Sequence, residues 1–134
     1  MNVKKLLLAA LAVFVTFQVL DFVIHNLILS ADYEASMQLW RPNMMDLMWL
    51  MTITSGLLSI AFVYVFAQGY SGKGIMEGIR FGLIFGFIIS VIGILNQYIV
   101  YPIPIELTIK WMVFGLIEFL VAGIVVSLVY KPKL

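Results

Sequence analysis

Cysteine is absent from this chain, and charged residues are scarce. None of the 134 residues is cysteine, and only one is histidine. These absences exclude disulfides, thiolate metal sites, thiol nucleophiles and any site that needs two histidines from one chain. Charged residues make up 11% of the sequence, whereas an ordinary soluble domain has about 25%. The net charge of +1 gives no reason to expect a nucleic-acid partner.

Long hydrophobic segments dominate the rest of the sequence, which is 63% hydrophobic. Four such segments lie at residues 6–29, 44–67, 79–100 and 107–130. At about 1.5 Å per residue, each can cross a hydrocarbon core of about 30 Å. Lipid offers no partner for backbone polar groups, so each segment is predicted to be a helix. The sequence therefore predicts an all-α membrane protein with a single domain, residues 1–134, surrounded by the lipid bilayer.

The links between these segments are short. Residues 30–43 are mostly polar, residues 68–78 are rich in glycine, and residues 101–104 contain two prolines that cannot continue a helix. Because short links join helices that are neighbours in space, we expect an up-down-up-down four-helix bundle.

Basic residues are distributed unequally between the two sides of this arrangement. Six fall on one side and two on the other: Lys4, Lys5, Lys73, Arg80, Lys131 and Lys133 against Arg41 and Lys110. Because basic loops are retained in the cytoplasm, we expect both termini there, in a multi-pass protein of the cell (inner) membrane. The first segment begins like a signal peptide, but its Ala-x-Ala pattern at residues 10–12 follows too few apolar residues, so we expect it to stay as a helix.

Several polar side chains lie inside the hydrophobic segments. An ionised Asp or Glu at a helix centre costs about 2.5–3.5 kcal/mol on insertion scales, so such residues normally have a partner or a function. Asp21 and His25 are four residues apart, which allows a direct hydrogen bond. We expect one cluster that binds a proton, a cation or a small solute, formed by Gln18, Asp21, His25, Asn96, Gln97 and Glu118.

Helical spacing also predicts which faces point inward. The third segment has a stripe of small residues that favours close helix packing, in this chain or between two copies: Gly78, Gly82, Gly86 and Ser90. The inward faces of the second and fourth segments are expected to hold Met45, Met48, Thr52, Ser55 and Ser59, and Trp111, Gly115, Glu118 and Ala122. The faces rich in Leu, Ile, Val and Phe are expected to face lipid. Glu106 and Lys110 are expected to pair at the outer surface.

Other interpretations of the polar residues remain open. Asp21, His25 and Glu118 are a mixed N/O donor set of the kind that Zn²⁺, Mn²⁺ or Fe²⁺ accepts, although one histidine and two carboxylates form a weak pattern. The methionines near the outer end suggest Cu(I) ligands or, in our preferred interpretation, packing. A haem would need His25 from two copies. The polar core can also be purely structural. We predict no metal and no cofactor.

Three motifs carry a resemblance: Trp40-Arg41-Pro42, residues 77–82 and residues 96–104. With them the chain resembles, over its whole length, a group of short four-helix bacterial membrane proteins to which no activity is assigned. The resemblance implies four membrane helices and no particular chemistry. The small multidrug transporters are similar in size and use a membrane carboxylate in their first helix, but without a neighbouring histidine, so Asp21 offers only an analogy.

Two classes of function follow, neither of them enzymatic. The first is a binding or transport protein whose intramembrane carboxylates exchange protons or cations. The second is an accessory or assembly subunit whose polar core specifies packing and whose partner is another membrane protein. Self-association into a homo-oligomer is compatible with both.

Overall fold

The computed structural model describes residues 1–132, and within them every regular element is helical. In this part of the chain four helical stretches are long and apolar enough to cross a membrane: Val3–Ile28, Met44–Gln68, Ile75–Val100 and Ile105–Val129. These confirm the four predicted membrane helices, although most begin a few residues earlier than expected. The main elements in chain order are α1 (Val3–Asp21), η1 (Phe22–Ile28), α2 (Ser30–Ala35), α3 (Met48–Gln68), α4 (Ile75–Gly86), η4 (Phe87–Ile92), α5 (Gly93–Val100) and α6 (Ile105–Val129).

Two membrane helices change to π-helical geometry in their second half. The segments η1 and η4 follow α1 and α4 without a break. At the end of η1, the Leu29 N–H donates to the carbonyl of Ile24 over 2.8 Å, an i→i+5 bond. Such π segments are uncommon and are often found at functional sites. The first of them contains the only histidine of the sequence.

The closest helix pair is α4 with α6, and glycine makes this approach possible. A Cβ atom added to Gly78 or Gly82 would overlap a backbone carbonyl oxygen of α6, that of Gly123 or of Phe119. At Gly86 it would meet the Phe119 side chain, and Ser90 lies against Gly115 in the same way. The predicted small-residue stripe is therefore buried against α6 of the same chain.

An aromatic core lies between α1, α3, α4 and α6. Phe17, Phe62 and Phe119 are buried and pack ring against ring, and the buried Phe66 packs against Phe81 of α4. The expectation that phenylalanine faces lipid is thus wrong for these positions.

The predicted inward face of the second membrane helix is also corrected. Met45, Met48 and Thr52 are exposed, Ser55 is partly buried and Ser59 is buried. The reason is that large aromatic rings fill the space between the crossing helices, and small polar side chains cannot fill it.

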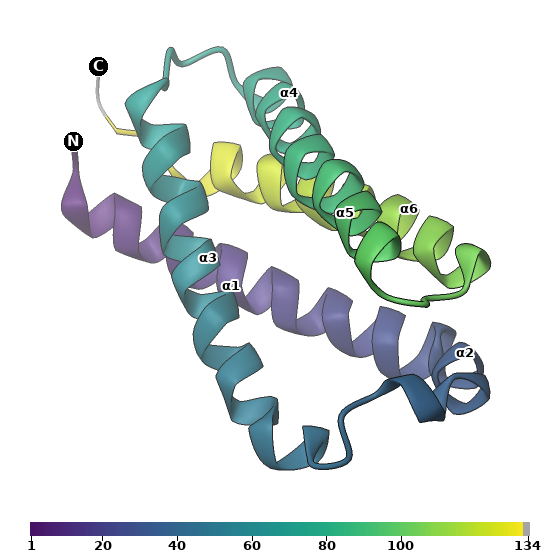
Figure 1. Ribbon diagram of the computed structural model, residues 1–134. Coiled ribbons are helices and arrows are strands. Elements are labelled where there is room, and N and C mark those ends of the chain that lie inside the picture. Colours follow the sequence, from purple (N-terminus) through teal and green to yellow (C-terminus); the bar gives the residue numbers. More distant parts are fainter. Residues whose placement is uncertain (133–134) are drawn as a thin grey trace.

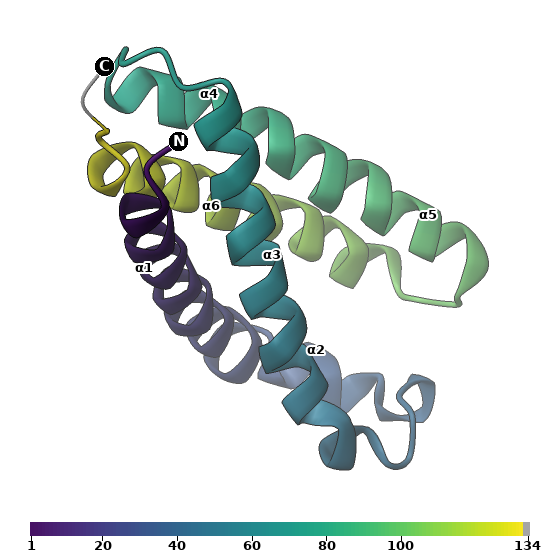
Figure 2. The same cartoon turned by 90° about the vertical axis from the view of Figure 1, so that its left-hand side faces the viewer.

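The start of α1 and the end of α6 lie at the same end of the molecule (Figures 1 and 2). There the Lys5 ammonium donates a hydrogen bond to the carbonyl of Lys131. The glycine-rich link between α3 and α4 is at this end as well, and Glu77 holds it by accepting the backbone N–H groups of Ser71 and Lys73. The link α2 and the turn at residues 101–104 lie at the opposite end.

Candidate intramembrane carboxylate and histidine site

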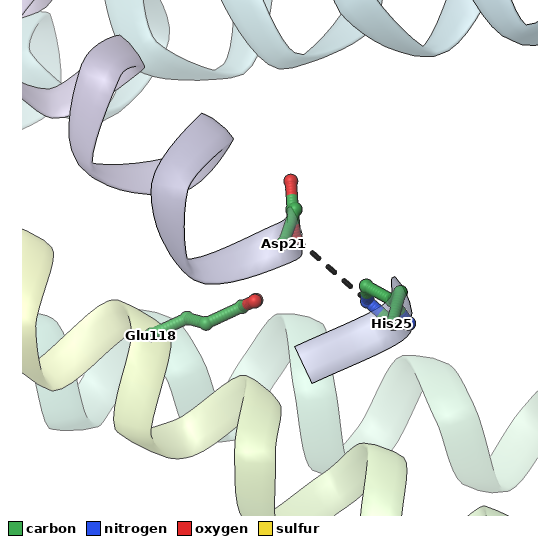
Figure 3. A group of neighbouring side chains, drawn as sticks. All are labelled: Asp21, His25 and Glu118. Carbon is green, nitrogen blue, oxygen red and sulfur yellow. Dashed lines mark ion pairs between the residues drawn. The ribbon is translucent and has the colours of Figure 1, made fainter. Parts of the chain in front are cut away.

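The structure brings together three of the predicted site residues. Asp21 is the last residue of α1, His25 lies in η1, and Glu118 lies near the middle of α6. One side-chain ligand atom from each lies within 4.8 Å of the others. Figure 3 shows the Glu118 side chain extending from its helix toward Asp21 and His25. The contact between α1 and α6 therefore holds two carboxyl groups and an imidazole at one place.

Asp21 and His25 do not form the predicted direct hydrogen bond. Their closest atoms, Nε2 of His25 and Oδ1 of Asp21, are 3.7 Å apart, which is too long for a hydrogen bond. The i, i+4 spacing rule assumes α-helical geometry, whereas the chain turns into a π-helix directly after Asp21. Both side chains are about two-fifths exposed, 38% for His25 and 42% for Asp21, so this side of the site is open.

Glu118 is the more enclosed carboxyl group. Its Oε1 atom is buried and has no hydrogen-bond partner among residues 1–132. Buried polar atoms in proteins are nearly always hydrogen-bonded, and each exception needs an explanation. Leaving one unpaired costs about 1–3 kcal/mol, and more for a charged group. This atom is the feature of the site that a purely structural role explains least well.

A tyrosine that the sequence did not indicate completes the site. The Tyr33 hydroxyl, on α2, is 2.5 Å from Nδ1 of His25. It also accepts a hydrogen bond of 2.8 Å from Nε1 of Trp111, on α6. Trp40 closes the group by packing its ring against both Tyr33 and Trp111. The sequence did indicate that Trp111 belongs near the site, because it is seven residues from Glu118 and shares a helix face with it. It gave no such indication for Tyr33, which lies in a link between membrane helices.

An ion pair lies at the outer edge of the same contact. The Lys110 ammonium donates to both carboxylate oxygens of Asp32, over 2.7 and 3.0 Å. The expected pairing of Lys110 with Glu106 is therefore wrong, and Glu106 is exposed. A row of polar groups therefore lies where α6 contacts α2 and the first membrane helix. It begins with Lys110 and Asp32, continues with Tyr33 and ends at the carboxyl pair.

The other three predicted site residues lie elsewhere. The Gln18 amide donates to the Ser55 hydroxyl on α3 over 3.1 Å, one turn before Asp21. Asn96 and Gln97 are exposed on α5, and within residues 1–132 their side chains form no hydrogen bond with the cluster. Their assignment to the site is corrected, because both side chains are exposed.

The three clustered groups also satisfy the donor requirements of a borderline divalent metal ion, since they offer one nitrogen and two carboxylate oxygens. Two carboxyl groups this close can alternatively hold a proton between them.

Comparisons with known protein families, curated proteins and solved structures find no match for this chain. The resemblance to short bacterial four-helix proteins therefore stays a prediction, and the function must be argued from the site alone.

Proposed function

We propose that this protein binds and releases a proton, in competition with small cations, at the carboxyl groups of Asp21 and Glu118 inside the membrane. The observation that carries the proposal is the buried Oε1 atom of Glu118, which has no hydrogen-bond partner in the described chain and belongs to a side chain directed at a second carboxyl group. The role is binding or transport, with no covalent chemistry.

Electrostatics explains why one proton belongs in this site. Two ionised carboxylates within 4.8 Å repel strongly where the dielectric constant is low, so one of them keeps its proton. When the site holds a proton, the protonated carboxyl group can donate a hydrogen bond to the other one. The buried oxygen of Glu118 then has a partner that it lacks when the proton is released. The other titratable groups around the pair are His25 and Tyr33, while Asp32 and Lys110 neutralise each other farther out.

Because Asp21 and His25 are partly exposed, the carboxyl pair is not sealed inside the helix bundle. The polar groups that follow from this point to the outer end of α6 favour exchange with that side of the membrane. Lys4, Lys5 and Lys73 belong to the opposite end of the molecule, where α1 begins and α6 ends. The positive-inside rule assigns that basic end to the cytoplasm, so the outer end of α6 faces the exterior. Lys133, also counted in the prediction, lies outside the described residues. We accordingly propose an up-down-up-down order with both termini in the cytoplasm and the cell (inner) membrane as its location.

Infrared difference spectroscopy on the protein in lipid tests proton binding directly. A protonated carboxyl group has a C=O stretching band that an ionised one lacks. At a pH above about 6, where ordinary carboxyl groups are already ionised, we expect the wild-type protein to show this band and to lose it as the pH is raised further, and we expect Glu118→Gln to lack it over the same range. Glu106→Gln, which changes an exposed glutamate on the same helix, serves as the matched control and should keep the band. A titrating band that persists unchanged in Glu118→Gln would overturn the proposal.

One observation favours a second candidate, the accessory subunit. Asn96 and Gln97 expose their amides on a membrane helix, and such groups commonly form hydrogen bonds across helix interfaces. A second copy or another membrane protein would cover them. Purification in a mild detergent should then recover a complex that Asn96→Leu/Gln97→Leu disrupts, and a monomer in both cases would reject this role.

A further inference from the structure

The hydrogen bonds around Tyr33 determine which nitrogen of His25 carries the proton. The indole N–H of Trp111 can only donate, so the Tyr33 oxygen accepts this bond. The hydroxyl proton then needs an acceptor of its own. Within the described part of the chain, the one acceptor in hydrogen-bond contact with this hydroxyl is Nδ1 of His25, at 2.5 Å.

Tyr33 keeps this proton under ordinary conditions. Burial raises the pKa of its hydroxyl above the ordinary value of 10.0 and outweighs the hydrogen bond from Trp111, which lowers it. Tyr33 can therefore donate a hydrogen bond at neutral pH, and an unprotonated Nδ1 of His25 gives its proton an acceptor.

We infer that Trp111 and Tyr33 hold His25 in the tautomer that carries its proton on Nε2, and that the site consequently accepts a proton and rejects transition-metal ions. Nε2 is the nitrogen that faces Asp21 at 3.7 Å. Its N–H points a positive dipole toward the carboxyl pair and stabilises negative charge there. Tyr33 and Trp111 are positioning residues, because they act on the carboxyl groups through His25.

The same bonds disfavour a metal ion at these three ligands. A histidine that binds metal through Nε2 donates its Nδ1–H to a neighbouring acceptor. The Tyr33 oxygen would then accept from both Trp111 and His25, and its own proton would lose its acceptor. Metal binding through Nε2 therefore requires the hydrogen bond between His25 and Tyr33 to reverse its direction. The tautomer of His25 does not depend on the proposed function. Only the statement that the bound ion is a proton rests on it.

The chain is well suited to a direct test, because its single histidine gives one signal for each ring nitrogen. In protein labelled with ¹⁵N-histidine and placed in lipid bilayers at neutral pH, nitrogen NMR should show a protonated Nε2 and an unprotonated Nδ1. Addition of Zn²⁺ should leave Nε2 protonated. A protonated Nδ1, or loss of the Nε2 proton when Zn²⁺ is added, would overturn the inference.

Two variants separate the positioning role from a structural one. Trp111→Phe and Tyr33→Phe should each produce a new population with protonated Nδ1 and shift the pH at which the Glu118 carboxyl band appears. Trp49→Phe, at an exposed tryptophan of α3, should change neither signal. An unchanged tautomer in both folded variants would contradict the assigned role. The tautomer is measured without reference to proton uptake, so a correct tautomer with no titrating carboxyl band would reject the proposed function alone.

Discussion

At Glu118 a buried carboxyl oxygen has no hydrogen-bond partner within residues 1–132, while its side chain is directed at another acidic group. A carboxyl group retained for packing alone would be expected to find a donor, because an unpaired buried polar atom weakens the fold. The conflict between local stability and the presence of this residue is typical of functional sites, where activity needs an unfavourable arrangement.

Replacing this carboxyl group should therefore stabilise the protein while abolishing its activity. At a pH where the pair has released its proton, we expect Glu118→Met, which keeps the length of the side chain, to raise the free energy of unfolding in detergent by about 1–3 kcal/mol. The infrared carboxyl band should be lost in the same variant. A clear decrease in thermal stability would instead mean that the carboxyl group holds the helices together.

The sequence predicted part of this site for a physical reason. Asp21 and Glu118 stand out because ionisable groups are costly inside a membrane, and helical spacing turns both toward the interior. Tyr33 could not be found in this way, since the position of a link depends on contacts that only the folded chain supplies. Asn96 and Gln97 satisfied the same polarity rule, yet they face outward, because polarity does not by itself specify which face is buried.

Among the elements, α4 and α6 depend most strictly on the absence of side chains. The hypothetical Cβ of Gly82 overlaps the backbone of Phe119, and a backbone contact cannot be relieved by rotating a side chain. Sequence spacing indicated the stripe, but it did not show whether the partner helix was in the same chain. The π-helical segments were not predictable, because a hydrophobic run has nearly the same pattern in α and π geometry.

Adding a single methyl group at this contact should separate the two helices. We expect Gly82→Ala to lower the free energy of unfolding by about 1–3 kcal/mol, the usual range for overpacking. Gly69→Ala is the matched control, because a Cβ there meets nothing within 4 Å, and it should change stability little. Thermal unfolding followed by circular dichroism distinguishes the two. Equal stability of both variants would contradict the close α4–α6 contact.

The short helix α2 should depend on its ion pair with α6. Lys110 and Asp32 are partly exposed, so their coupling energy should be modest, about 0.2–1 kcal/mol. A double-mutant cycle with Asp32→Asn and Lys110→Met measures it, and Glu106→Gln with Lys110→Met provides the comparison. A larger coupling for Glu106 than for Asp32 would show that α2 is placed elsewhere.

On the scale of the whole molecule, four membrane helices were predictable from length and hydrophobicity alone. Their order in space was less so. The first membrane helix packs against both α3 and α6, and α4 packs chiefly on α6, with the α3–α4 contact bridged mainly by aromatic rings such as Phe62 and Phe81. Packing of this kind depends on the shapes of large side chains, which a pattern of polar and apolar residues does not describe.

The proposed orientation can be tested with single cysteines, because the natural chain has none. Glu34→Cys and Gly69→Cys introduce exposed thiols at the two opposite ends of the molecule. In intact cells, a membrane-impermeant maleimide should label the first and spare the second, and both should react after lysis. The reverse pattern would place the termini outside.

The measurement that tests the central claim most directly asks whether α1 and α6 hold their acidic positions against each other in the membrane. In the paired variant Asp21→Cys/Glu118→Cys, a short bifunctional thiol reagent should cross-link the two cysteines within one chain. The pair Asp21→Cys/Glu106→Cys, with its second thiol at the exposed end of α6, should stay unlinked. Failure of the first pair to react while the second does would show that the two carboxyl groups do not share a site.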